Sequence, residues 1–431
     1  MRSRLFWRRS STALGIYLSA LLGFAATLVA ASTLGLTDFG RFALVMAAAG
    51  FLQTLLDLTV EEAVTKYGFR YSTAERWGRL RRLFARALWF KGSGAVLAGL
   101  ALVGLAPLAE TLFDAEGLVV PLLVAALLPL AQAPEGLAGT ALILRDRYDV
   151  RAAFLALSMA LRLGAVAIGA QQGVTETMVA IVVAQVVATA AVGAAGLAAF
   201  RRFPRAPAEP LDDDSRSIRT FVLQSSLATG VVSLRTTLTP LLLGTVSSIA
   251  QVGVFRVALT PQQGLTALSA PARMILLTEQ TRDWERGRHA SVFAGVRRYS
   301  VGAAALMAVV VIPLLVWMPD LLRLIGDDYV RGTDAARVIV VAAVIQFVFG
   351  WTKSFPVSIG RPNLRIVTHG LETVVLVPLV LLLGARWGAT GAAVAVLVST
   401  VVFASHWTLL FLRLRREPHV AIRAPREAVA R

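Results

Sequence analysis

The chain is a succession of long apolar stretches separated by short polar segments. Each stretch is close to the roughly 20 residues that an α-helix needs to cross the hydrocarbon core of a bilayer. About twelve such stretches can be placed, and they cover residues 12–33, 39–62, 84–108, 118–142, 152–171, 177–200, 221–244, 250–273, 292–317, 335–358, 364–384 and 388–412. The pattern therefore predicts an all-α membrane protein with about twelve transmembrane helices.

Two neighbouring stretches, the seventh and the eighth, each carry an arginine inside the apolar run. These are Arg235 and Arg256, and only residues 245–249 connect the two stretches. At about 1.5 Å per residue, both arginines lie roughly 10–15 Å from this turn, at similar depth. A cation inside a bilayer costs roughly 2.5–3.5 kcal/mol on insertion scales. We hypothesise that a water-filled cavity receives an anion there, with Arg162 of the fifth stretch as a third cation.

These arginines could also have purely structural roles. Each could pair with an acid on a neighbouring helix, which would make it a structural residue. Arg256 lies near the end of its stretch, so its long side chain could also extend outward to the membrane surface.

The loops between the stretches carry most of the positive charge. If the N-terminus is cytoplasmic, the cytoplasmic segments hold about 33 of the 43 lysines and arginines, as the positive-inside rule expects. The apolar run 10–33 is longer than the 7–15 residues of a signal-peptide core, so we expect a first transmembrane helix and not a removed leader. The alternation predicts an even number of spans with both termini in the cytoplasm.

The longest polar connector, residues 201–219, divides the spans into two groups of six. We therefore expect one six-helix bundle at residues 1–200 and a second, with a basic tail, at residues 220–431, joined by a cytoplasmic linker. The turn at 34–43 (LGLTDFGRFA) is echoed at 243–258 (LGTVSSIAQVGVFRVA). Because each half has an even number of spans, the halves have the same orientation, and the cleft between them is the expected transport path.

Composition removes several classes of function. The chain is 56% hydrophobic and 16% charged, against about 45–50% and 25% for soluble domains. The net charge of +17 therefore reports basic loops and not a nucleic-acid partner. The chain has no cysteine, and the sequence contains no Walker loop, Gly-x-Ser-x-Gly elbow or metal signature. We expect no enzyme activity, no metal and no cofactor.

Acidic residues at the end of the second stretch form a first group of candidates. Asp57 and Glu61 are spaced i,i+4 and share a helix face, and Glu62 follows them. They predict a cytoplasmic gate that pairs with basic residues of the other bundle, or else a solvated helix end with local salt bridges. Glu135 lies at similar depth beside Pro134, which frees backbone carbonyls, and is a further candidate.

His369 and Glu372 are spaced i,i+3 in the eleventh stretch, so their side chains can touch. Such a pair could couple transport to protons, or it could be a structural ion pair. Glutamines recur within the stretches, where they join helices or bind sugars. Gln224 and Gln262 flank the arginine pair and are our candidates for sugar contacts.

The chain resembles the Wzx-type oligosaccharide flippases of bacterial polysaccharide biosynthesis, relatives of the MATE multidrug transporters and of the lipid II flippase. The resemblance covers nearly the whole chain and includes the turn at 34–43, DLTVEE at 57–62, LIGDDYVRG at 324–332, and the division into six and six spans. It implies a MATE-like fold and alternating access. The implied substrate is an undecaprenyl-pyrophosphate-linked oligosaccharide, moved from the cytoplasmic to the periplasmic leaflet of the inner membrane for cell-surface polysaccharide such as O-antigen. It also implies a polysaccharide polymerase and glycosyltransferases as partners.

On this interpretation Arg162, Arg235 and Arg256 hold the pyrophosphate, because a planar guanidinium donates two parallel hydrogen bonds to phosphate oxygens. Two other functions remain open. A MATE-like exporter of small organic cations should have an acidic cavity. A membrane glycan ligase should have acids or arginines in a large periplasmic loop, and the corresponding loops here are short.

Overall fold

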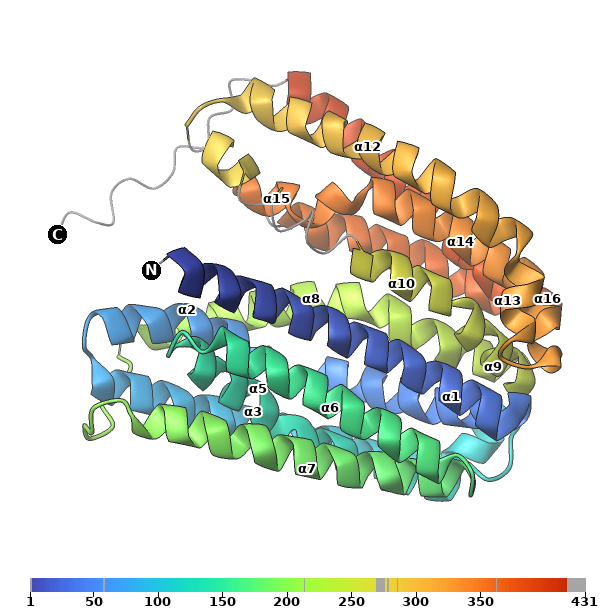
Figure 1. Ribbon diagram of the computed structural model, residues 1–431, viewed down its shortest axis with the longest axis horizontal. Helices are drawn as coiled ribbons and strands as arrows, with labels where there is room; N and C mark the ends of the chain where they lie inside the picture. Colours follow the sequence, from blue (N-terminus) through green and yellow to red (C-terminus); the bar gives the residue numbers. More distant parts are fainter. Residues whose placement is uncertain are drawn as a thin grey trace.

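Figure 1 shows a computed structural model of the chain, which describes residues 2–56, 59–212, 214–268, 276, 279–284, 286–361 and 363–416. The described residues form helices and turns, with no strand among them, so the predicted all-α fold class is confirmed. The elements are α1 (Arg2–Leu56), α2 (Val60–Thr73), α3 (Trp77–Phe113), α4 (Val119–Ala125), α5 (Leu127–Ile143), α6 (Tyr148–Gly169), α7 (Val174–Arg201), α8 (Asp214–Val246), α9 (Ile249–Ala258), α10 (Thr260–Leu268), α12 (His289–Val316), α13 (Met318–Arg323), η1 (Asp327–Gly332), α14 (Thr333–Val348), η2 (Gly350–Lys353), α15 (Phe355–Ser358) and α16 (Asn363–Arg416).

The longest helices, α1 and α16, each contain two membrane spans. In α1 the chain turns at Gly35, where φ is 75° and ψ is 171°. In α16 it turns at Gly388, where φ is 55° and ψ is −130°. Side chains with a Cβ rarely adopt these positive φ angles, whereas glycine adopts them readily. The first and last pairs of predicted spans are therefore joined by turns that depend on glycine.

Seven helical segments among the described residues are long and apolar enough to cross a membrane. They are 14–56, 77–113, 119–143, 148–169, 174–201, 289–316 and 363–416. The first and last of these hold two predicted spans each. The remaining three predicted spans correspond to α8, to α9 with α10, and to α14 with the short helices that follow it.

The two bundles meet at one end of the molecule, which we call the joined end; it contains Gly35, Gly253 and Gly388. A single buried cluster there includes Phe39 and Leu122 of the first bundle and Phe255 and Ile339 of the second. Across the same contact, the Tyr329 hydroxyl of η1 donates a hydrogen bond of 2.9 Å to the Ala31 carbonyl of α1. The joined end is thus a continuous apolar core shared by both bundles.

At the opposite end, which we call the separated end, the buried residues form two different clusters. One surrounds Tyr71 and Leu80 of α2 and α3, and the other surrounds Trp351 and Trp407 of η2 and α16. Figure 1 shows the orange and red helices of the second bundle diverging from α1 toward this end.

The chain between α7 and α8 packs on the hairpin of α2 and α3. Phe203 stacks on Trp77, with ring centroids 5.7 Å apart. The Asp214 carboxylate accepts hydrogen bonds from Arg70 at 3.0 Å and from the Tyr71 hydroxyl at 2.9 Å. The start of α8 also packs there through Val222. The predicted linker is therefore held against the first bundle, and its last residues already belong to α8.

Candidate functional site

The largest cavity described lies between the two bundles and has a volume of about 780 Å³. Its walls come from α1 and α6 of the first bundle and from α9 and α10 of the second, and they include Tyr17, Phe24, Leu155, Met159, Arg162, Arg256 and Gln263. A smaller cavity of about 130 Å³ shares Arg162 and Arg256 with it and extends to Thr236 and Thr237 of α8. The two arginines therefore lie where the two cavities adjoin.

Arg162 and Arg256 bring one cation from each bundle to the same place. Both side chains are partly accessible, and the charge of Arg162 acts on Arg256. Among the side chains that the structure describes, neither arginine is neutralised by a carboxylate. Two neighbouring cations inside a membrane are costly and repel each other. Their arrangement favours water or an anionic ligand between the bundles.

Two predicted site residues lie outside what the structure describes. Asp57 is one of them. Arg235 is part of α8, but its side chain is not among those described. Of the two candidate glutamines, Gln224 is exposed on α8 and lines none of the cavities described here. Gln262 is partly buried, and its neighbour Gln263 lines the main cavity.

A polar cavity of about 240 Å³ lies inside the first bundle. Its lining includes Gln53, Glu61, Lys91, Gln132, Glu135 and Arg151, and it shares Leu155 with the main cavity. Lys91 Nζ lies 2.9 Å from Glu61 Oε1. A Cβ at position 136 would overlap the Glu61 carboxylate, so Gly136 makes room for it. In this conformation Glu61 thus pairs within its own bundle.

A chain of amide hydrogen bonds crosses the first bundle beside this cavity. Gln53 donates to Gln132 at 2.9 Å, and Gln132 donates to Gln185 at 3.3 Å. Gln185 in turn donates to Glu135 at 2.7 Å and to Thr189 at 3.0 Å. The chain connects the second, fourth and sixth predicted spans and places the Glu135 carboxylate at its end.

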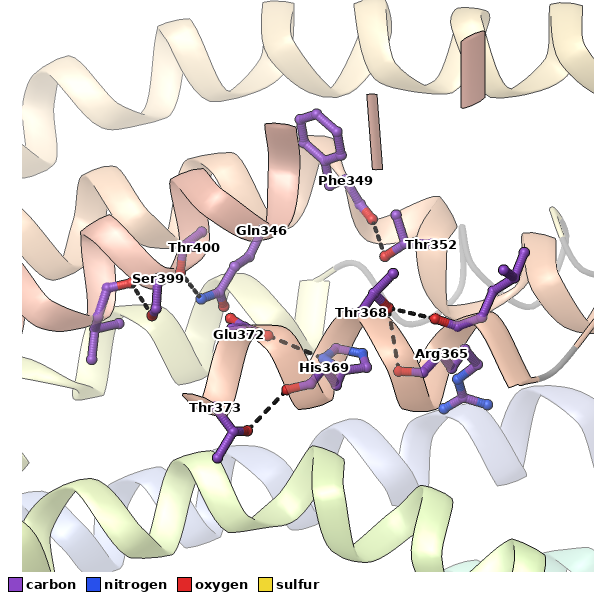
Figure 2. A network of polar contacts seen from close by, with 12 residues as sticks. Gln346, Phe349, Thr352, Arg365, Thr368, His369, Glu372, Thr373, Ser399 and Thr400 are labelled. Atoms are coloured by element: carbon purple, nitrogen blue, oxygen red, sulfur yellow. Dashed lines mark hydrogen bonds and ion pairs between the residues drawn. The ribbon is translucent and has the colours of Figure 1, made fainter. Parts of the chain in front are cut away.

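The second bundle repeats this arrangement. Gln262 donates to Gln346 at 2.7 Å, and Gln346 donates to Thr400 at 3.0 Å. Figure 2 shows the Gln346 amide directed at Thr400. These residues belong to the eighth, tenth and twelfth predicted spans, which are the counterparts of the second, fourth and sixth. The pseudo-symmetry therefore extends to the polar interior of each bundle.

His369 and Glu372 lie together in α16, as their spacing allows. Figure 2 shows the contact, in which Nδ1 of His369 is 3.1 Å from Oε2 of Glu372. Glu372 is only 1% exposed, and the His369 ring stacks on Phe403 with centroids 5.0 Å apart. The pair is thus a buried acid beside a group that can gain or lose a proton.

Glu62 connects the bundles at the separated end. Its carboxylate accepts a hydrogen bond from the Ser225 hydroxyl of α8. The charge of Glu62 also acts on Arg365 of α16. The buried Nε of Arg365 has no hydrogen-bond partner among the described residues. The two charges lie on different bundles and are of opposite sign.

Sequence reasoning missed several residues of these sites. Arg151 immediately precedes the predicted span 152–171, so the sequence pattern places it in a loop. Gln53, Gln132 and Gln185 are among the glutamines that recur within the predicted spans, and the sequence does not distinguish them as site residues. A usable signal was present, because these amides occupy alternate spans of one half.

The fold is that of a multi-pass membrane protein of MATE-like architecture, with a cavity between its two bundles. Similar solved structures include the lipid II flippase MurJ in an inward closed conformation (10% identity, TM-score 0.73, covering 94% of this chain and 90% of that one). They also include an inward-facing MATE family multidrug transporter (15%, 0.66, 94% of each chain) and a MOP superfamily transporter from Pyrococcus furiosus (14%, 0.62, 95% of each chain).

The sequence profile of the polysaccharide biosynthesis protein family matches residues 9–276, more than half of the chain. The protein belongs to that family. A comparison with curated protein sequences finds no match.

Proposed function

We propose that the protein flips an undecaprenyl-pyrophosphate-linked oligosaccharide from the cytoplasmic to the periplasmic leaflet of the bacterial inner membrane, for cell-surface polysaccharide such as O-antigen. The observation that carries the proposal is the pair Arg162 and Arg256, which line one cavity from opposite bundles without a described carboxylate partner. Their planar, permanently charged guanidinium groups suit a pyrophosphate. Arg235 is a third proposed cation.

In the proposed cycle the separated end faces the cytoplasm, together with both termini. The head group enters there while the lipid tail stays in the bilayer. The two bodies that rock against each other are residues 1–200 and 220–431, with 201–219 as the linker. Rocking would close the separated end and open the joined end, which is the parallel-repeat form of alternating access.

The polar cavity of the first bundle is the proposed site of the sugar. Amides and paired charges line it, and such groups can exchange hydrogen bonds with sugar hydroxyls at little cost in desolvation. It shares Leu155 with the main cavity, so a head group on the arginines would reach it. Glycosyltransferases and a polymerase are the proposed partners, since they make and consume such a lipid-linked sugar.

Two charge pairs are proposed to control the cycle. Glu62 and Arg365 attract each other across the separated end, so they would form a cytoplasmic gate together with Asp57 and Glu61. Glu372 is buried and contacts the partly buried His369, so a proton exchanged there would couple transport to the proton gradient.

A MATE-like exporter of organic cations is the alternative that the fold permits. Such a substrate needs carboxylates where the main cavity here carries two arginines. For the Pyrococcus furiosus relative, a reversed polarity of the binding pocket is taken to suggest a different function. The same reasoning favours an anionic substrate for this chain. The glycan ligase alternative has less support, because the solved structures that resemble this chain are transporters.

The test is transport of a labelled polyprenyl-pyrophosphate oligosaccharide by the purified chain in liposomes. We expect Arg162→Gln and Arg256→Gln each to slow flipping about 10- to 100-fold, since charged hydrogen bonds contribute about 1.5–3 kcal/mol. Arg386→Gln, which removes an exposed arginine at the joined end, is the matched control. Wild-type flipping by both cavity variants, or transport of organic cations in place of the lipid, would refute the proposal.

A further inference from the structure

A groove of about 300 Å³ lies between α2, α3 and the start of α8. It shares no lining residue with the cavities between and within the bundles. Its walls are apolar and include Val60, Val64, Leu83, Ala87, Ile218 and Val222. Its volume reaches the lower end of the range for small-molecule sites, which are typically concave and mostly apolar.

Two arginines stand at the rim of this groove, Arg86 of α3 and Arg219 of α8. Both contact Ser215: Arg86 Nη1 donates to its hydroxyl at 3.1 Å, and Arg219 Nε donates to its carbonyl at 3.4 Å. Both are exposed, and within the described part of the chain neither forms an ion pair. Ser215 therefore holds two uncompensated cations beside one opening.

One helical turn further along each helix the surface becomes apolar. Phe90 of α3 and Leu223 of α8 line the groove and are 36% and 55% exposed. Trp89, next to Phe90, is 68% exposed. Large exposed apolar side chains on a predicted membrane span face acyl chains, and tryptophan favours the membrane–water interface. The groove thus runs from a basic rim toward the hydrocarbon region.

We propose that this groove binds one anionic phospholipid of the surrounding bilayer, with its phosphate between Arg86 and Arg219 and one acyl chain along the apolar walls. The choice of occupant follows from charge. Basic residues beside a membrane attract anionic lipids, and none of the groove's lining residues is acidic, so nothing there meets the amine of a zwitterionic head group. Asp214, the acid next to Ser215, is occupied by Arg70 and Tyr71.

The experiment is native mass spectrometry of the full chain in neutral detergent during titration with phosphatidylglycerol, or with phosphatidylcholine of the same acyl chains. We expect one tightly retained phosphatidylglycerol per chain. The double variant Arg86→Gln/Arg219→Gln should weaken its binding up to about 30-fold, since each basic residue near the surface contributes about fivefold. The matched control is Arg82→Gln/Arg216→Gln, which removes the same charge from exposed residues that do not line the groove.

Two further arms test the acyl chain and the head group separately. Ala87→Leu narrows the groove without a charge change and should weaken phosphatidylglycerol binding. Inorganic phosphate at millimolar concentration should not displace the lipid, because it lacks the chain. Equal retention of both lipids, equal loss in the control pair, or displacement by phosphate would overturn the proposal. If Ala87→Leu does not fold, the double variant Arg86→Gln/Arg219→Gln still tests the lipid-binding proposal. Both arginines are exposed, so their replacement should not prevent folding.

Discussion

Gly40 of α1 and Gly253 of α9 lie backbone against backbone at the joined end. A Cβ on Gly253 would lie 3.2 Å from the backbone nitrogen of Gly40 and 2.6 Å from the carbonyl oxygen of Leu36. A Cβ on Gly40 would overlap the Ile249 carbonyl. Small residues let membrane helices approach this closely. The two glycines come from the segments that echo each other in the two halves, so the repeat unit itself supplies the contact that closes this end.

Gly253→Ala should open the joined end. The added methyl group meets backbone, which cannot move aside as a flexible side chain would. We expect a cost of about 1–3 kcal/mol to the closed arrangement. The chain has no cysteine, so a single cysteine in place of buried Ala31 reports opening through its rate of reaction with a thiol reagent. Gly104→Ala is the control, because no atom of another described element lies within 4 Å of a Cβ at this position. Unchanged labelling in Gly253→Ala would show that the contact does not close this end.

Removing a cavity arginine should stabilise the protein while impairing transport. Arg162 lies near Arg256 without a described carboxylate to offset its charge. Arg162→Gln removes the repulsion and one cation from within the membrane span, so we expect the free energy of unfolding to rise by about 1–3 kcal/mol. Thermal melting of the substrate-free protein in detergent measures this, with Arg386→Gln for comparison. A lower melting temperature would instead show that Arg162 has a structural partner.

Asp214 should hold the α2–α3 hairpin to α8. It accepts hydrogen bonds from Arg70 and Tyr71, and its side chain is 14% exposed. Since Arg70 is largely exposed, its ion pair contributes little. We expect Asp214→Asn to destabilise the protein by about 1–2 kcal/mol, measured by thermal melting near neutral pH. A melting temperature equal to that of the wild type would show that the contact is dispensable.

The hydrogen bond between Tyr71 and Asp214 should make the stability of the protein depend on pH. Burial of the Tyr71 side chain, together with its hydrogen bond to Asp214, raises the pKa of Tyr71. The folded state therefore holds this proton more tightly than the unfolded state. The resulting stability is complete below the ordinary tyrosine pKa near 10 and is lost as the pH rises above it. The melting temperature of Tyr71→Phe should therefore fall less than that of the wild type as the pH is raised above about 10. Tyr148→Phe, at an exposed tyrosine, should leave it unchanged.

The repeated amide chains should contribute separately to the two bundles. Gln346→Leu removes two hydrogen bonds of the second bundle, and Gln132→Leu removes two of the first. Interhelical hydrogen bonds in membranes contribute about 0.6–2 kcal/mol each, so each variant should lose about 1–4 kcal/mol. The two losses should add in the double variant, because the sites are distant. Thermal melting of the three variants checks this, and strong non-additivity would show that the bundles are coupled.

The sequence predicts which residues of the site lie in membrane spans, but not which of them meet. The apolar stretches placed Arg162 and Arg256 inside spans, but not beside each other, because they are 94 positions apart in the chain. Spacing did indicate the contact between His369 and Glu372, since residues three apart share a helix face. The pairing of Glu61 with Lys91 and the two amide chains lie between helices and had no local signal.

By itself the sequence determined the number and order of the spans, their division into two similar halves, and the presence of cations in apolar surroundings. These follow from stretch length, loop charge and local repeats, which are properties of neighbouring residues. Only the tertiary structure decided which side chains share a cavity and which end of the molecule is closed. Those depend on how each helix is rotated about its axis and on where backbones approach, as at Gly40 and Gly253. Both are set by the packing of distant segments, which no local pattern encodes.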